Sequence, residues 1–307
     1  MRALVISKSD RIVDMGEVTD PVPAPNQAVV AVKAISLNRG EVNAAVAAAT
    51  PGAVPGWDVA GVVAEAAADG SGPPAGARVV GLVLGGGWAE RAAVPTDVLA
   101  ELPDSVSFED ASTLPVAGLT ALRCLRRGGL LLGRRILITG GAGGVGRFAI
   151  QLAHQAGATV TAVVGRPERA EGLEALGADE VVVGSLTEGS QYDLVLESVG
   201  GESLRDAFGR LAPQGTIVSF GASAQQPTTF EVPVFYRRQA TLIGFLIFPD
   251  LRQHGSGRDD LAYLAGLVAS GGLDTGIDRV LPWNQATEAC RALLERRVAG
   301  KAVLTVG

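Results

Sequence analysis

A glycine-rich loop at residues 141–146 is the feature that most constrains how this chain can fold. The loop follows an apolar run at residues 136–139, which is typical of a buried strand, and it opens a helical pattern that continues to Gly157. A strand, a glycine loop and a helix in this order predict the start of a βαβ unit in a parallel sheet. Glycine is frequent throughout the chain, so the motif indicates a dinucleotide site only because a strand precedes it and a helix follows it.

The loop, Gly141-Ala142-Gly143-Gly144-Val145-Gly146, has the glycine spacing that binds a dinucleotide. We expect Gly141 to permit the tight turn, Gly143 to let the backbone approach a pyrophosphate, and Gly146 to let the helix pack on the strand. The free N–H groups at the start of the helix, around Gly144 and Val145, would then bind the pyrophosphate. The alternative is a glycine-rich turn that binds nothing.

Strands and helices alternate around this loop, from residue 117 to residue 250. The expected strands lie at 159–164, 180–183, 194–196, 216–220 and 242–248, and the expected helices at 119–125, 149–157, 167–176 and 204–211. Such alternation indicates a parallel sheet covered by helices. We therefore expect a doubly wound α/β Rossmann domain over 117–250.

The first hundred residues have short apolar runs separated by clusters of proline and glycine, which predict a small β-barrel or sandwich. The runs lie at 3–6, 28–35, 59–64, 78–84 and 88–94. A turn from Pro103 leads into a helix, with Ser107 and Asp110 as a capping box. Helices are expected at 261–270 and 285–296, and the strand at 302–304 should rejoin the N-terminal domain. The second domain would thus comprise 1–116 and 251–307.

The end of the second Rossmann strand favours NADP(H) over NAD(H). An NAD enzyme usually carries Asp or Glu there, about 20 residues after the glycine loop, to hold the ribose 2′-hydroxyl. Here the strand runs into Gly165 and Arg166, with Arg169 one helical turn further on. Guanidinium groups suit a 2′-phosphate, which they can bind through two hydrogen bonds. The alternative is two solvated arginines on a helix face.

Composition excludes several other classes of protein. The formal net charge is −6 and the pI is about 5.1, so the basic face of a nucleic-acid binder is not expected. No run of 18 apolar residues suggests a transmembrane helix. Cys124 and Cys290 lie far apart and form no CxxC pair, which argues against a disulfide framework. We expect a cytoplasmic protein.

Several further motifs resemble those of the medium-chain dehydrogenase/reductase superfamily, in its zinc-free quinone oxidoreductase branch. They are Ser36-Leu37-Asn38-Arg39-Gly40-Glu41, Gly56-Trp57-Asp58-Val59-Ala60-Gly61, Gly85-Gly86-Gly87-Trp88-Ala89-Glu90, Ala117-Gly118-Leu119-Thr120-Ala121 and the glycine loop with its helix. The matches run nearly from end to end. The resemblance implies a GroES-like β-barrel catalytic domain, a Rossmann domain inserted before the C-terminal segment, and a cleft between them.

The resemblance also assigns candidate site residues. Asn38 and Thr120 would flank the nicotinamide and orient the ring or the substrate carbonyl, as catalytic residues. The end of the Rossmann strand expected at 216–220 would approach the dinucleotide through Phe220, Gly221 and Ala222. The residues beside the nicotinamide or edging an apolar substrate pocket would be Trp57, Phe245 and Ile247. A tyrosine that the branch often places near the 2′-phosphate is Gly184 here.

No metal site is expected. Asn38 and Trp57 stand where zinc-containing members of the superfamily have cysteine and histidine, and a catalytic zinc needs about three protein ligands. The chain has two histidines, His154 and His254, and neither lies in a ligand motif. Asp58 replaces the usual Glu of its motif, and we expect this carboxylate to be structural.

The implied reaction is hydride transfer from NADPH to a quinone. A quinone needs little help from a side-chain acid because its reduced form is a good anion, whereas a saturated ketone would need a metal or a positioned acid. The first alternative is an enoyl or enone reductase of a biosynthetic pathway, and the second is an NADPH-binding protein with little turnover. The resemblance further suggests a homodimer that pairs through the edge of the Rossmann sheet, where the run at 242–248 would lie.

Overall fold

The computed structural model describes residues 1–7, 12–47, 50–186 and 189–307. Contacts divide the chain into two compact units. Unit 1 comprises Met1–Leu119 and Leu251–Gly307, and unit 2 comprises Thr120–Asp250. The first boundary lies three residues after the expected one at 116/117, and the second lies at the expected 250/251. The chain thus passes from unit 1 into unit 2 and back.

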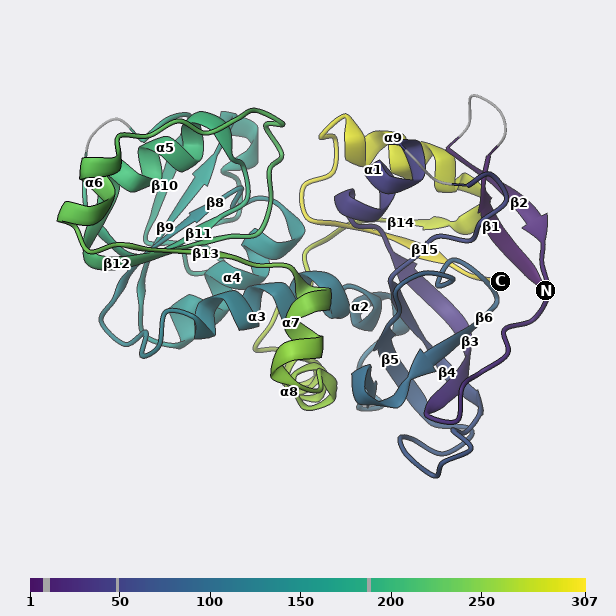
Figure 1. The fold of residues 1–307 in the computed structure, drawn as a ribbon. Coiled ribbons are helices and arrows are strands. Elements are labelled where there is room, and N and C mark those ends of the chain that lie inside the picture. The colour runs from purple at the N-terminus through teal and green to yellow at the C-terminus, as the bar shows by residue number, and fades with distance from the viewer. Residues whose placement is uncertain (8–11, 48–49, 187–188) are drawn as a thin grey trace. The chain divides into compact units, whose positions relative to one another are not determined.

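Unit 1 is built on a mostly antiparallel sheet with the strand order β14-β15-β3-β4-β5-β7, in which β6 also pairs with β3 (Figure 1). Its strands are β3 (Gln27–Ser36), β4 (Asp58–Glu65), β5 (Arg78–Leu82), β6 (Arg91–Pro95), β7 (Leu99–Glu101), β14 (Ile277–Pro282) and β15 (Lys301–Thr305). A separate pair is formed by β1 (Arg2–Ile6) and β2 (Val13–Glu17). The C-terminal strand β15 lies antiparallel to β3, which confirms that the end of the chain rejoins this domain.

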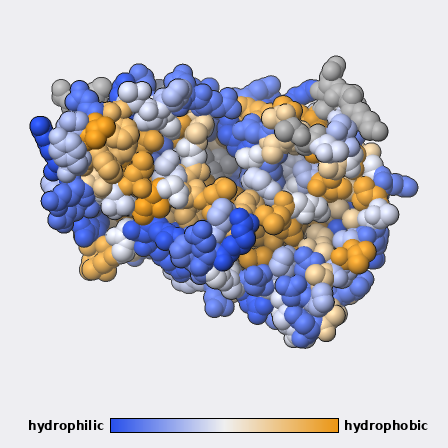
Figure 2. Space-filling view, viewed as in Figure 1, coloured by the Kyte–Doolittle hydropathy of each residue, from blue (hydrophilic) through white to orange (hydrophobic). Residues whose placement is uncertain are grey.

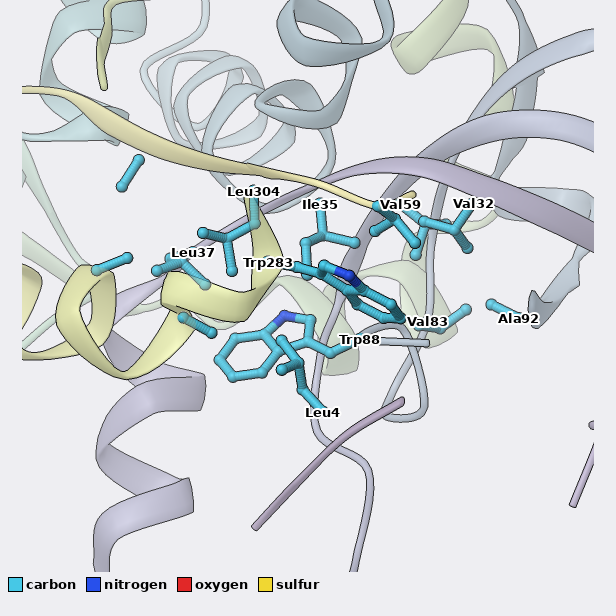
Figure 3. Close-up of a cluster of buried hydrophobic side chains, with 14 of the residues drawn as sticks. Leu4, Val32, Ile35, Leu37, Val59, Val83, Trp88, Ala92, Trp283 and Leu304 are labelled. Carbon is cyan, nitrogen blue, oxygen red and sulfur yellow. The ribbon is translucent and has the colours of Figure 1, made fainter. Parts of the chain in front are cut away.

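The core of unit 1 lies between this sheet and the segments that cover it. Figure 3 shows two tryptophans at its centre: Trp88 is fully buried, and Trp283 is 3% exposed. Aliphatic side chains from several strands surround them, among them Ile35 on β3 and Leu304 on β15. Most positions of β3, β4, β5 and β15 are buried, so consecutive residues of these strands, which point to opposite faces, are both removed from solvent.

The helices of unit 1 are short. They are α1 (Arg39–Ala47), α2 (Phe108–Ser112), α8 (Arg258–Ala269), α9 (Ala286–Leu294) and the turns η1 (Thr96–Val98), η2 (Leu114–Gly118) and η4 (Trp283–Gln285). The expected capping box at the start of α2 is confirmed, because the backbone N–H of Asp110 donates to Ser107 Oγ at 3.0 Å. Helix α1 was not predicted from the sequence, and it follows directly on β3.

Unit 2 contains a parallel sheet with the strand order β10-β9-β8-β11-β12-β13 (Figure 1). The strands are β8 (Arg135–Thr139), β9 (Thr159–Val164), β10 (Glu180–Val183), β11 (Tyr192–Glu197), β12 (Leu211–Ser219) and β13 (Thr241–Gly244). The helices are α3 (Leu119–Arg126), α4 (Gly144–Gln155), α5 (Gly201–Arg210), α6 (Val232–Arg237), α7 (Ile247–His254) and the turn η3 (Pro167–Arg169). This is the expected Rossmann architecture.

Two predicted elements of unit 2 are wrong in part. The helix expected at 167–176 is limited to the 3₁₀ turn η3, because Gly172 and Gly177 adopt left-handed φ angles of 77° and 104° that interrupt a helix. The strand expected at 242–248 ends at Gly244, which pairs with Ser219, the last residue of β12. Beyond that point Phe245 N still donates to Ser219 O at 2.9 Å, and α7 begins at Ile247.

A third prediction, a strand from Trp88 to Val94, starts too early. The regular strand β6 begins at Arg91. Trp88 instead donates its backbone N–H to Pro55 O at 2.9 Å, and its carbonyl accepts from Leu4 N at 2.8 Å. These irregular bonds leave the Trp88 side chain in the core of unit 1 rather than on a strand face.

Candidate functional site

The glycine loop of unit 2 lies at the point where the strand order of the sheet reverses. From β8 the chain continues outward to β9 and β10 on one side, and β11, β12 and β13 extend on the other. All six described strands are parallel, so their carboxyl ends share one edge. In open parallel sheets, ligands bind at this edge, at the reversal point. The loop after β8 is therefore where a bound ligand is expected.

Backbone geometry explains why this loop needs glycines. A Cβ atom added to Gly146 would lie 2.5 Å from Gly140 O and 2.7 Å from Gly141 O, so α4 can approach β8 this closely only without a side chain there. A Cβ on Gly143 would lie 3.2 Å from Gly140 O. The sharp turn itself occurs at Gly140, with a φ of 64°, and not at Gly141 as expected. Gly141 instead packs against Ala162, whose Cβ would be 3.0 Å from an added one.

Helix α4 begins at Gly144, immediately after the turn, and Gly143 at its N-cap supplies no side-chain acceptor. The first N–H groups of a helix have no partner inside the helix and carry a partial positive charge. With no side chain to satisfy them, the N–H groups from Gly144 to Gly146 can bind a phosphate.

A buried carboxylate, which the sequence analysis missed, stabilises this edge of the sheet through hydrogen bonds. Glu197, the last residue of β11, is fully buried. It accepts hydrogen bonds from the backbone N–H groups of Val199 (2.9 Å) and Gly200 (3.0 Å) and from the hydroxyls of Ser203 (3.0 Å) and Thr139 (3.2 Å). Since Thr139 ends β8, Glu197 ties β11 to the strand that precedes the glycine loop. It is a structural group at the edge of the candidate site.

The segment after β12 approaches the same network through its backbone. Ser223 N donates to Ser198 O at 3.2 Å, and Ala224 N donates to Val199 O at 2.8 Å. A Cβ on Gly221 would lie 2.8 Å from Ser198 O, so this position requires glycine. Of the residues expected to approach a dinucleotide here, Phe220 donates its backbone N–H to Glu197 O at 2.9 Å. Ala222 is exposed.

The three residues assigned to the adenosine end of a dinucleotide, Gly165, Arg166 and Arg169, follow the carboxyl end of β9. Gly165 and Arg166 are exposed, and Arg169 is partly exposed at the end of η3. The sequence analysis missed a third guanidinium: Arg147, in the first turns of α4, has its Nη2 3.9 Å from a Cβ built on Gly172. Its buried Nε has no hydrogen-bond partner among the described residues.

Three of the residues expected near a nicotinamide lie in unit 2 and two lie in unit 1. In unit 2, Thr120 lies in α3 and is 6% exposed. Phe245 follows β13, Ile247 begins α7, and they are 7% and 3% exposed. Phe245 N donates to Ser219 O at 2.9 Å, so this segment is held against the end of β12. In unit 1, Asn38 and Trp57 lie at the start of α1 and just before β4.

In unit 1, Asn38 is the centre of a buried polar cluster. Its Nδ2 donates to Asp58 Oδ2 at 2.7 Å and to Glu41 Oε1 at 3.1 Å. Its Oδ1 accepts from Lys301 Nζ at 2.8 Å. Lys301 also forms an ion pair with Asp58 at 3.5 Å, and Ser36 Oγ donates to the same carboxylate at 2.6 Å. Glu41, Asp58 and Lys301 are each at most 3% exposed.

Removal from water changes the acidity of these carboxyl groups. Burial, reinforced by the nearby charge of Asp58, raises the pKa of Glu41 to about 8. Burial also raises the pKa of Asp58, although Lys301 opposes that effect. Glu41 is further held by the backbone, since Trp57 N donates to its Oε2 at 2.8 Å. The Trp57 ring packs over the start of α1, with Cη2 3.0 Å from a Cβ built on Gly40.

Asp58 has the surroundings of a structural residue, and it also lies beside Asn38. The carboxylate is fully buried and also accepts from Val116 N at 2.9 Å, as a structural group would. It also contacts the Asn38 amide directly. Sequence reasoning missed Glu41 and Lys301; the available signal was that Lys301 is one of three lysines in the chain.

Among the described residues, no three His, Cys, Asp or Glu side chains gather in a group that could hold a metal ion. No described helix combines the length and the apolar character needed to span a bilayer.

Two family models match the chain. The model described as alcohol dehydrogenase GroES-like domain matches residues 24–104, in unit 1. The model described as zinc-binding dehydrogenase matches residues 144–254, which begin at α4.

Known proteins resemble the whole chain. A chloroplast envelope quinone oxidoreductase homolog of Arabidopsis thaliana is 30% identical over 94% of this chain and 92% of its own length. The solved structure of Escherichia coli quinone oxidoreductase complexed with NADPH is 25% identical, with a TM-score of 0.87 over 100% of both chains. The CurK enoyl reductase structure is 25% identical, with a TM-score of 0.84 over 100% of this chain and 99% of that one.

Proposed function

We propose that this chain, which belongs to the medium-chain dehydrogenase/reductase family and to its quinone oxidoreductase branch, reduces a quinone with NADPH. The observation that carries the proposal is the glycine loop at the reversal point of the parallel sheet, where α4 begins without a side-chain cap.

The residues around the loop fit a dinucleotide. Gly143, Gly144, Val145 and Gly146 would bind the pyrophosphate through the backbone. Gly146 in particular has no room for a side chain, since its Cβ would lie 2.5 Å from Gly140 O. Phe220, Gly221 and Ala222, on the neighbouring strand end, would approach the cofactor through their backbone. The related Escherichia coli enzyme, whose structure is a complex with NADPH, supports this assignment.

Selection of NADPH over NADH is assigned to the end of β9. Gly165 leaves open space there, since a Cβ built on it meets nothing within 4 Å. Arg166 and Arg169 follow it and would bind the 2′-phosphate, and Arg147 adds a third guanidinium near the same segment. The absence of a tyrosine at Gly184 leaves these arginines as the main source of selectivity.

At the reacting end, the chain's contribution is orientation and exclusion of water. NADPH, when bound, supplies the hydride. Thr120 would orient the nicotinamide with its hydroxyl, and the buried side chains of Phe245 and Ile247 would present an apolar surface. We assign Asn38 to hydrogen bonding at the reacting groups and Trp57 to the edge of the substrate pocket. The chain would work without zinc.

The acceptor is proposed to be a quinone because the carboxyl groups nearest to Asn38 are engaged internally. Asp58 and Glu41 accept hydrogen bonds from Asn38, Ser36 and the backbone, and both are buried. They are therefore poorly placed to protonate a substrate, and a quinone requires no such step. An enone is the second candidate, favoured by the similarity to an enoyl reductase over the whole chain.

A homodimer is proposed through β13, the edge strand of the sheet. Leu242 on this strand is 42% exposed, and Val232 and Tyr236 on α6 are 62% and 59% exposed. Figure 2 shows hydrophobic residues over the region of α6 and β13. A second copy would cover both the apolar side chains and the unpaired backbone groups of the edge.

The test measures NADPH oxidation against matched acceptors: a small quinone, a larger quinone, an enone and a saturated ketone. Fast turnover of a quinone and none of the ketone is the expected result. Turnover confined to the enone would replace the quinone assignment by the second candidate. Tight NADPH binding with no turnover of any acceptor would refute the proposal and leave a cofactor-binding role.

A further inference from the structure

The hydrogen-bonding groups of Asn38 are nearly all occupied inside unit 1. An asparagine amide has two hydrogens to donate and an oxygen with two lone pairs. Both hydrogens point to carboxylates, on Asp58 at 2.7 Å and on Glu41 at 3.1 Å, and one lone pair faces Lys301 at 2.8 Å. Within the described part of the chain, one acceptor position on Oδ1 is what Asn38 has left to offer.

The surroundings permit one orientation of this amide. If the group were flipped, its NH₂ would face the ammonium of Lys301 and its oxygen would face the Asp58 carboxylate. Both of these hydrogen bonds would be lost, because donor would face donor and acceptor would face acceptor in a buried place. Lys301 is decisive because its positive charge requires an oxygen on the side of Asn38 that it contacts.

Lys301 is itself fixed. Its ammonium donates to Leu37 O at 3.2 Å, to Asn38 Oδ1 and to Asp58 Oδ2, and the residue is 3% exposed. These three partners account for its three hydrogens. It is therefore in no position to act on a substrate directly, and whatever it contributes to a reaction must pass through the groups that it holds.

We propose that Asn38 serves the reaction solely as a hydrogen-bond acceptor and that Lys301 is the positioning residue that enforces this role. The inference rests on the proposed function, in which Asn38 contacts the reacting groups. It narrows the role expected from the sequence, in which Asn38 orients the ring or the substrate carbonyl, to that of an acceptor. Asp58 assists by holding the Asn38 Nδ2 and the Lys301 ammonium with the same oxygen.

The ligand group that Asn38 recognises must then be an N–H or O–H donor. Two sources carry such a group: the carboxamide or ribose hydroxyls of the nicotinamide cofactor, and a hydroxyl that the acceptor bears or gains on reduction. A cofactor source would make the Kd for NADPH depend on Asn38. An acceptor source would leave that Kd unchanged and lower kcat/KM for the quinone at saturating NADPH.

The experiment is a double-mutant cycle with Asn38→Ala and Lys301→Met in the full chain, read as kcat/KM for the quinone and as the Kd for NADPH. If Lys301 acts through Asn38, Lys301→Met lowers kcat/KM for the quinone, or raises the Kd for NADPH, about ten- to a hundredfold in the wild-type background. The same change then has less than about a twofold effect in the Asn38→Ala background. An equal factor in both backgrounds would overturn the inference.

Two further variants keep the result interpretable. Arg78→Met removes another partly buried cation of unit 1, which donates to Pro103 O at 3.0 Å and to Asp104 O at 2.9 Å, and it should leave both constants unchanged. Lys301→Arg keeps the charge and displaces the donor. If Lys301→Met does not fold, the cycle is run with Lys301→Arg, which should show a smaller loss that again disappears when Asn38 is absent.

A readout besides activity separates this inference from the proposed function. The Asn38 side-chain amide signal in NMR, assigned by its loss in Asn38→Ala, should exchange slowly with solvent because both hydrogens are bonded to carboxylates. Lys301→Met should make this exchange faster, and unchanged exchange would refute the positioning role even in an active enzyme. A slow signal in a protein that reduces no acceptor would instead mean that the proposed function has failed while the positioning stands.

Discussion

Replacing Glu41 with glutamine should change how the stability of unit 1 depends on pH. Burial and the charge of Asp58 raise the pKa of Glu41 from its ordinary value of 4.5 to about 8 in the folded chain, against the opposing charge of Lys301. Between these two values the folded chain holds a proton that the unfolded chain has released. The free energy of unfolding of the wild type therefore falls as pH rises, by about 1.4 kcal/mol per pH unit.

The glutamine variant lacks this titration, so the difference between the two proteins isolates it. From pH 5 to pH 8 the variant should gain about 4 kcal/mol relative to the wild type, and above pH 8 the difference should stay constant. The substitution also has a cost that does not depend on pH, because glutamine Nε2 cannot accept the hydrogen bond from Trp57 N. That loss is about 1–3 kcal/mol, so the two stability curves should cross.

The assay is urea unfolding from pH 5 to pH 9, followed by tryptophan fluorescence. Trp57, Trp88 and Trp283 are the three tryptophans of the sequence, and all of them lie in unit 1, so the signal reports the unit that contains Glu41. A difference between variant and wild type that stays flat over the whole range would show that Lys301 keeps Glu41 ionised, and it would refute the reasoning.

Four further predictions concern the cofactor, the loop, the metal and the dimer. Arg166→Ala combined with Arg169→Ala should raise the Kd for NADPH about tenfold or more and spare NADH, and an equal loss for both cofactors would contradict the 2′-phosphate assignment. Gly146→Ala should lower the free energy of unfolding by about 1–3 kcal/mol in denaturant melts, since its Cβ would lie 2.5 Å from Gly140 O, whereas Gly165→Ala, which meets nothing within 4 Å, should be close to neutral. Chelators should not affect turnover, and a loss of activity that zinc restores would show that the chain needs the metal. Leu242→Lys should shift the mass measured by light scattering from dimer to monomer, and an unchanged mass would exclude β13 as the interface.

The sequence predicts unit 2 well because its decisive features are local. A strand, a glycine loop and a helix follow one another within residues 136–157, and hydrophobic period and glycine spacing both act over that range. Prediction fails where tertiary pairing ends an element. The strand β13 stops at Gly244, opposite Ser219, where β12 also ends. Glycines at 172 and 177 in left-handed conformations leave turns where apolar spacing suggested a helix.

The site of unit 1 depends on contacts that sequence patterns do not register. Lys301 and Asn38 lie 263 residues apart, and they meet because β15 pairs with β3, the strand that leads into Asn38. The return of the C-terminal strand to this domain was expected, yet its partner strand and the side chains that face each other across the pair depend on register. Motif reasoning could therefore single out Asn38 and could not find the lysine that bonds to it.

The state of Asn38 bears on the choice of acceptor. A carbonyl that receives hydride develops negative charge on its oxygen, and an amide N–H could stabilise that charge only if it were free to point there. In unit 1 both amide hydrogens are held by Asp58 and Glu41. Releasing one would cost its hydrogen bond to a buried carboxyl group, about 1–3 kcal/mol or more. In its proposed role Asn38 thus gives no support to an oxyanion, so the proposed reaction suits acceptors that delocalise the incoming charge themselves. Quinones do so over the whole ring and enones over the enolate, whereas a saturated ketone does not, so the order of rates in the acceptor panel should be quinone, then enone, with the ketone unreactive.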